Sequence, residues 1–326
     1  YIYILFNFLS YFFDKRKESE NRLLDYFYDS LGDENRADLE NDDVIELYIN
    51  DDKKVWIDTL SSGRHFTGRY MDSSDSMRVI QAVADYTDKI VDKTSPFVSS
   101  ELPGTGSRFQ GVIPPIVDNP VFNIRKKGIR VFTLDDYIKS GSLSLKQKEI
   151  IIESVNTKKN ILIVGGTSSG KTTFANAVIA EIAKTGDRLI IMEDTKEIQS
   201  TAEDTLRMTT SDFASMLDLF KSSMRQRPDR LIAGEVRGEE ALSMLTGWNS
   251  GHSGGVCTVH SDSARGGLTQ LEQYVQIKSV SAQEKLIASA VNLIIVIKKV
   301  GTERKITEIA KVNGWENGVY LLERIA

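Results

Sequence analysis

Residues 165–172 read Gly-Gly-Thr-Ser-Ser-Gly-Lys-Thr, which satisfies every fixed position of the pattern G-x-x-x-x-G-K-[ST]. Glycines in such a loop let the backbone bend so that its N–H groups face an anion, and a following helix N-terminus adds partial positive charge. The lysine is then placed for the β- and γ-phosphates, and the last hydroxyl for Mg²⁺. The sequence therefore predicts a site for ATP and Mg²⁺ made by Gly165, Gly166, Thr167, Ser168, Ser169, Gly170, Lys171, Thr172 and Thr173.

The flanking residues give this loop the context that the pattern requires. Residues 161–164 form an apolar, β-branched run, and residues 173–184 carry apolar side chains at helical spacing. We therefore expect the loop to join a strand to a helix.

Acidic residues end two further predicted strands. Glu193 and Asp194 close the run RLIIMEDT, and Glu235 closes RLIAGEV. A carboxylate at a strand tip beside a phosphate loop can polarise the attacking water or hold Mg²⁺ through water. We expect Glu235 to be the catalytic acid, with Glu193 as the alternative, and expect Thr172, Glu235 and Asp194 to serve the metal.

Arginines and histidines add to this set. Arg225, Arg227, Arg230 and Arg237 surround the second strand, and although any one of them could form a surface ion pair, together they offer the positive charge that a phosphoryl-transfer transition state needs. We assign Arg227 to catalysis and Arg237 to nucleotide contact. His252 and His260 flank a predicted strand, and no cysteine or carboxylate at ligand spacing completes a metal site around them. We expect the imidazole of His260 to act in catalysis, facing the γ-phosphate or Glu235, and His252 to contact the nucleotide.

Composition and charge narrow the classes of function. The chain has 326 residues and a formal net charge of −5, so nothing in its charge balance demands nucleic acid as a partner. Its one cysteine, Cys257, excludes an internal disulfide framework and a four-cysteine zinc site, and fits a reducing, cytoplasmic location.

The chain length favours two domains. Residues 1–13 form an apolar leader that is too short to span a membrane and could instead be a membrane-surface or partner-binding helix. Residues 14–130 are predicted as a small α+β domain, including a hairpin over 43–58. Residues 131–145 read as a linker that ends where Ser144 caps a helix, and residues 146–326 as the nucleotide domain.

Within the nucleotide domain, strand and helix patterns alternate. The predicted strands are residues 161–164, 188–193, 230–235, 255–260 and 292–298. Such alternation indicates an α/β fold with a parallel sheet, whose ligands bind at the carboxyl ends of the strands.

Four blocks, GGTSSGKT, IIMEDTKE, RQRPDRLIAGEVRGEEAL and WNSGHSGGVCTVHSDSA, occur in this order. Together they resemble the secretion and traffic ATPases of type II and type IV secretion, pili and conjugation, and within them the TrbB-like ATPases of conjugative transfer. The resemblance implies a RecA-like domain behind an N-terminal domain, and a hexameric ring with ATP at subunit boundaries. It also implies inner-membrane partners and a peripheral position on that membrane, and it makes Arg108 and Arg125 candidates for nucleotide contact.

We therefore expect a hexameric ATPase that powers a secretion or conjugative transfer apparatus by ATP-driven domain motion. The alternatives are an ATPase of pilus assembly, retraction or tight adherence, and a nucleotide-gated assembly module with little turnover. A DNA helicase or packaging motor of the same core is a third, which the acidic net charge makes less favourable.

Overall fold

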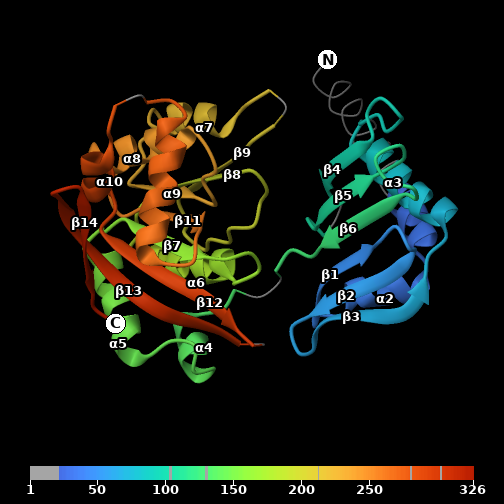
Figure 1. Cartoon of the computed structure of the whole chain (residues 1–326), viewed down its shortest axis with the longest axis horizontal. Helices are drawn as coiled ribbons and strands as arrows, with labels where there is room; N and C mark the ends of the chain where they lie inside the picture. Colours follow the sequence, from blue (N-terminus) through green and yellow to red (C-terminus); the bar gives the residue numbers. More distant parts are fainter. Residues whose placement is uncertain (1–21, 103–104, 129–130, 212, 280, 302) are drawn as a thin grey trace, which may run out of the picture. The chain divides into compact units, whose positions relative to one another are not determined.

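The computed structural model describes residues 22–102, 105–128, 131–211, 213–279, 281–301 and 303–326. Contacts divide the chain into two compact units, Tyr1–Ile129 and Arg130–Ala326, each with its own sheet and core (Figure 1). The apolar leader 1–13 lies outside the described residues. Within the described part of the chain, no helix combines the length and the apolar character needed to cross a bilayer.

The first unit is a six-stranded antiparallel sheet with helices on one face (Figure 1). The strand order is β3-β2-β1-β6-β5-β4. Apolar residues alternate with polar ones along β2, so Val55 and Ile57 enter the core while their neighbours face the other way. The predicted hairpin over 43–58 is present as β1 and β2. The bounds are α2 (Asp33–Glu40), β1 (Val44–Ile49), β2 (Lys54–Thr59), β3 (Gly63–Tyr70), α3 (Ser73–Tyr86), β4 (Phe97–Glu101), β5 (Arg108–Val112) and β6 (Val121–Arg125).

The second unit is an eight-stranded sheet in the order β14-β13-β12-β7-β11-β10-β8-β9. Strands β12 to β9 are parallel, and β13 and β14 extend the sheet in antiparallel fashion. The strands are β7 (Ile161–Gly165), β8 (Leu189–Glu193), β9 (Thr205–Thr209), β10 (Arg230–Ala233), β11 (Val256–His260), β12 (Leu293–Val300), β13 (Glu303–Glu316) and β14 (Val319–Arg324). All five predicted strands are confirmed, whereas β9, β13 and β14 were not predicted.

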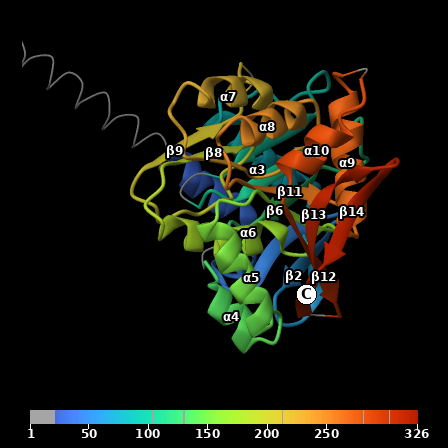
Figure 2. The same ribbon diagram turned by 90° about the vertical axis from the view of Figure 1, so that its left-hand side faces the viewer.

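Helices cover both faces of this sheet, as the alternating pattern predicted. Along β7, Ile161 and Ile163 pack into one core with α4, α5 and α6, while Leu162 and Val164 pack into the other with α7 to α10. Figure 2 shows α4, α5 and α6 gathered together, apart from α9 and α10. The bounds are α4 (Leu134–Lys139), α5 (Leu145–Asn156), α6 (Lys171–Ala183), α7 (Met216–Ser223), α8 (Glu240–Asn249), α9 (Ala264–Gln276) and α10 (Glu284–Ala290).

The segment 131–145, expected as a linker, instead contains a packed helix. Leu134 and Tyr137 of α4 are buried in the core that surrounds α6. The Ser144 cap is present, because its hydroxyl accepts a hydrogen bond from the backbone N–H of Gln147 in a capping box. Residues 131–145 therefore belong to the second unit.

A buried ion cluster joins the amino ends of the parallel strands. Arg230, at the start of β10, is 1% exposed, and its Nε lies 2.7 Å from Oδ2 of Asp187. Lys158 Nζ lies 2.9 Å from the other oxygen of Asp187. Burial by itself would raise the pKa of Asp187, but hydrogen bonds from Lys158, Arg230 and Thr185 outweigh it and lower the pKa from 3.8 to about 2. Asp187 therefore supplies the negative charge that pairs with both cations at the amino ends of these strands.

We predict that Asp187→Asn lowers the free energy of unfolding at pH 7 by about 2 kcal/mol or more, because Arg230 keeps its buried charge without a counter-ion. Since the folded-state pKa of Asp187 is depressed, its contribution is complete above about pH 4 and is lost as the pH falls towards about 2. Urea unfolding of both proteins between pH 7 and pH 2 measures this difference.

The matched control is Asp135→Asn, because Asp135 is 63% exposed in its ion pair with Lys148. It should cost less than about 1 kcal/mol. Equal losses in the two variants would contradict a special role for Asp187.

Candidate functional site

The loop between β7 and α6 has the conformation that its glycines predict. Gly170 has φ +90° and ψ 22° at the N-cap of α6, and Ser168 has φ +57°. Residues of left-handed conformation set among right-handed ones turn successive backbone N–H groups towards one concave side. At Gly165 a Cβ would lie 2.5 Å from the carbonyl oxygen of Ile297, so no other residue fits. The loop and the helix N-terminus together form an anion-binding cradle.

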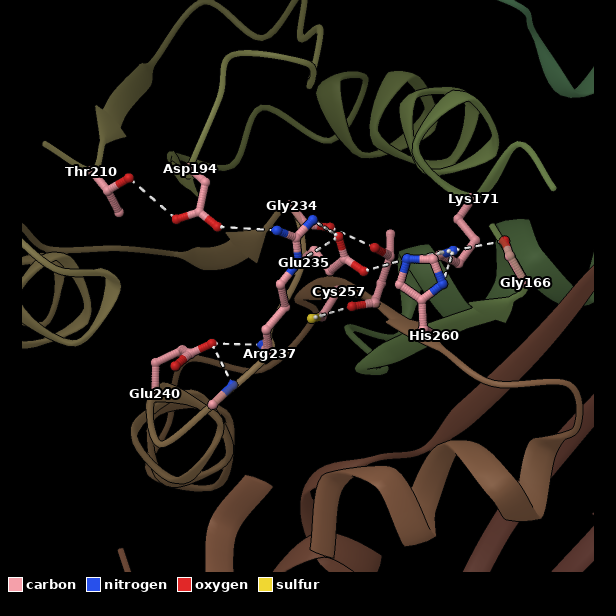
Figure 3. Close-up of polar contacts among 12 residues, drawn as sticks. Gly166, Lys171, Asp194, Thr210, Gly234, Glu235, Arg237, Glu240, Cys257 and His260 are labelled. Atoms are coloured by element: carbon pink, nitrogen blue, oxygen red, sulfur yellow. Dashed lines mark hydrogen bonds and ion pairs between the residues drawn. The ribbon is translucent and has the colours of Figure 1, made fainter. Parts of the chain in front are cut away.

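The parallel strands bring the expected acids and one histidine to the same edge as this cradle. His260 is paired in register with Gly165 across β11 and β7. Glu235 follows β10, and Glu193 is the last residue of β8, in the same sheet. Because parallel strands end at a common edge, residues far apart in the sequence gather here, as Figure 3 shows.

A continuous chain of polar contacts crosses this edge (Figure 3). Lys171 Nζ donates to the carbonyl of Gly166 at 3.0 Å and lies 3.2 Å from Nδ1 of His260. Nε2 of His260 lies 3.0 Å from Oε1 of Glu235. The chain of contacts therefore links the phosphate-loop lysine to the expected catalytic acid through one imidazole.

On its other side, Glu235 is held by Arg237. Arg237 Nη2 lies 2.5 Å from Oε2 of Glu235, and Nη1 lies 3.9 Å from Asp194. Burial lowers the pKa of Arg237, but the hydrogen bond and charge of Glu235, with Asp194, raise it above its ordinary value, so the guanidinium stays charged beside Glu235. The Glu235 side chain is 18% exposed. A carboxylate oriented in this way can polarise a water for attack on a phosphoryl group.

Glu193, expected as the alternative acid, has different surroundings. It is 3% exposed, and its Oε1 accepts backbone hydrogen bonds from Glu197 at 2.9 Å and Ile198 at 2.6 Å. Burial raises the pKa of Glu193, and these two N–H groups oppose that rise. Its carboxylate thus holds the loop after β8, which makes Glu193 a positioning residue in this structure.

His252 and Arg227 do not lie at the phosphate site of their own chain. Both precede their strands, and Nδ1 of His252 lies 3.1 Å from the carbonyl of Pro228, just before β10. The length of a five-residue strand, about 16 Å, separates that edge from His260. Arg230 is also at that edge, buried in its ion cluster.

Arg108 and Arg125 belong to the first unit, where they face each other directly across β5 and β6. Glu101 stands opposite Arg108 on β4, and Glu46 opposite Arg125 on β1. Directly opposed like charges destabilise a sheet, and the acids on the two flanking strands offset that repulsion. Strand register explains why the two arginines lie together, although 17 positions separate them.

The residues at this edge fit the predicted complex of ATP with Mg²⁺. Thr172 is the second residue of α6, and Asp194 and Glu235 are exposed or half-buried carboxylates at the same edge. The buried hydroxyl of Ser169 makes no hydrogen bond among the described residues, so it is available to donate to a phosphate oxygen. Those residues form no cluster of three or more His, Cys, Asp or Glu suited to a metal ion.

Sequence reasoning missed Glu240. Its Oε1 accepts hydrogen bonds from the backbone N–H of Arg237 at 2.7 Å and of Gly238 at 3.0 Å (Figure 3). It thereby fixes the turn that presents Arg237 to Glu235. The signal in the sequence was an acid three residues after the arginine, at the start of a helix.

Comparisons with known proteins agree with the predicted resemblance. The family described as "Type II/IV secretion system protein" matches residues 44–314. The conjugal transfer protein TrbB of Rhizobium radiobacter is 42% identical over 310 residues, which cover 94% of this chain and 96% of that protein. A type IV secretion system protein VirB11 of Bartonella henselae is 27% identical and covers 83% of this chain and 89% of that protein.

Solved structures show the same fold. The ATPase DotB of Legionella pneumophila aligns with a TM-score of 0.60 at 16% identity, covering 82% of this chain and 76% of that chain. The pilus retraction motor PilT aligns with a TM-score of 0.59 at 18% identity, covering 86% and 79%. The family match over residues 44–314 and the 42% identical relative establish that the chain belongs to the type II/IV secretion system family of ATPases, among its TrbB-like conjugal transfer members.

Proposed function

We propose that the chain hydrolyses ATP at the carboxyl edge of its second unit, and that Glu235 polarises the attacking water. The observation that carries this proposal is the contact chain from Lys171 through His260 to Glu235. A site that only bound nucleotide would need the loop and its lysine, but not an oriented carboxyl group beside them.

Each residue has a distinct task in this proposal. The loop N–H groups and Lys171 hold the phosphates, Thr172 supplies the metal-facing hydroxyl, and Arg237 orients Glu235. His260 lies between Lys171 and Glu235, where its hydrogen bonds depend on the contacts that Lys171 makes. Mg²⁺, when bound with the nucleotide, neutralises charge on the transferring phosphoryl group.

We further propose that the active form is a hexamer with ATP between subunits, at the cytoplasmic side of an inner-membrane transfer apparatus. The hexamer and the membrane partners follow from the family resemblance. The opposite-edge position of Arg227 and His252 supports a shared site, because these side chains can meet a nucleotide only on another subunit. The name of the Rhizobium radiobacter relative supports conjugal transfer as the process served.

We predict that Glu235→Gln retains ATP binding, because the side-chain volume and one hydrogen-bonding oxygen are kept. Hydrolysis should fall by orders of magnitude, because the carboxylate charge is lost. Lys171→Ala should instead weaken ATP binding itself. Phosphate release and nucleotide titration on the purified full chain measure the two effects separately.

Glu239→Gln is the matched control, since Glu239 pairs with Lys278 in a half-exposed ion pair near the same turn. It should hydrolyse ATP as the unmodified chain does. If Glu235→Gln hydrolysed ATP at a near-normal rate and Glu193→Gln did not, Glu193 would be the residue that polarises the attacking water. Binding without measurable turnover in the unmodified chain would favour the nucleotide-gated assembly module.

We predict that a non-hydrolysable ATP analogue favours the oligomer. At 100 times its dissociation constant, such a ligand stabilises the state that binds it by about 2.7 kcal/mol. Light scattering at micromolar protein measures the effect, and a monomer with and without the analogue would contradict a shared site.

Mixing two inactive variants tests whether Arg227 acts across subunits. If it does, Lys171→Ala and Arg227→Ala chains should recover some hydrolysis together, because mixed boundaries contain one intact site. Arg225→Ala serves as the control, since Arg225 is exposed two positions away and should be active alone. Failure of every pair to recover activity would place the whole site within one chain.

A further inference from the structure

The hairpin of β12 and β13 extends beside the phosphate loop, on the side away from Glu235. β12 pairs with β7 in parallel up to Val296, level with Val164, and then continues to Val300. β13 returns in antiparallel register, with Arg304 opposite Lys299. In the sheet order, β12 and β11 lie on opposite sides of β7, so this hairpin and His260 flank the loop from its two sides.

From this hairpin, the side chain of Arg304 lies beside the loop at Gly170. A Cβ built on Gly170 would lie 2.9 Å from Cδ of Arg304 and 3.4 Å from its Nε. Gly170 is the residue immediately before Lys171, at the N-cap of α6. The arginine therefore lies against the backbone of the phosphate cradle.

The guanidinium of Arg304 carries a charge that the described residues do not neutralise through a hydrogen bond or an ion pair. Glu303, next to it, pairs with Lys305 at 2.7 Å instead. The side chain is half-buried, which limits its hydration. A guanidinium presents five donors in a planar fork suited to phosphate oxygens. Position, charge and donor geometry therefore all fit a phosphate.

We propose that Arg304 binds the diphosphate portion shared by ATP and ADP, on the opposite side of the nucleotide from Glu235. This inference rests on the proposed nucleotide site and adds a binding residue to it. The γ-phosphate faces Glu235, which polarises the water that attacks it, so the α- and β-phosphates are the part within reach of the hairpin. Arg304 thus contributes to ATP and ADP affinity alike and little to the chemical step.

Titration of the full-length chain with ATP, ADP and AMP tests this proposal. Arg304→Ala should weaken ATP and ADP binding by similar factors, about tenfold or more, because a hydrogen-bonded charge is lost. It should raise KM by more than it lowers kcat. Arg304→Lys should restore only part of the affinity, because an ammonium lacks the planar fork.

Lys299→Ala is the matched control, because Lys299 stands opposite Arg304 on the same hairpin and is exposed. It should leave nucleotide affinity unchanged. The proposal would be overturned if Lys299→Ala lost as much nucleotide affinity as Arg304→Ala and that loss disappeared at high salt. The effect would then come from the general positive charge of the hairpin. Unchanged ADP affinity in an Arg304→Ala chain with normal thermal unfolding would also overturn it. Lys171→Ala distinguishes failure of the Arg304 proposal from failure of the proposed nucleotide site. If Lys171→Ala binds ATP normally, the nucleotide site lies elsewhere.

Discussion

Parallel backbone pairing of β7, β11, β10 and β8 is the constraint on which the site depends. This register sets Gly165 level with His260 and brings Glu235 to the same edge. Gly165 and His260 are 95 positions apart in the sequence, and Glu235 lies 25 positions before His260. Only the common direction of the strands brings their carboxyl ends together. A slip of one residue in any strand would move its acid or imidazole away and reverse its core side chains.

Close packing at glycines enforces that register. A Cβ on Gly255 would lie 2.1 Å from the indole nitrogen of Trp248. The indole N–H donates to the carbonyl of Leu231, so Trp248 of α8 fills the space where β10 and β11 begin. Asn160 adds a second connection, because its side-chain oxygen accepts hydrogen bonds from the N–H groups of Gly254 and Gly255. The glycine-rich segment before β11, read from the sequence as part of a histidine motif, thus has a structural task at the amino edge.

Local signals account for what the sequence could predict. The phosphate loop, its flanking strand and helix, and the Ser144 cap depend on neighbouring residues, and all are present. No comparable local signal in the sequence marks strand β9, whose residues are half-buried or exposed, or the long strand β13. The surroundings of Glu193 depend on how the loop 194–198 folds back, which no spacing reveals. The edge at which His252 lies follows from strand direction, because a residue that precedes a parallel strand lies at the opposite edge from one that follows it.

The contact between Tyr137 and Phe174 has a mechanical consequence. Tyr137 belongs to α4, the first helix of the second unit, and its ring meets that of Phe174 at 90° with centroids 5.0 Å apart. Phe174 lies one turn into α6, so it moves with the end of the helix that carries Lys171. Since packed cores transmit displacement and compress little, a shift at that end pushes on α4. The aromatic pair therefore couples the position of the phosphate loop to that of α4 within the second unit.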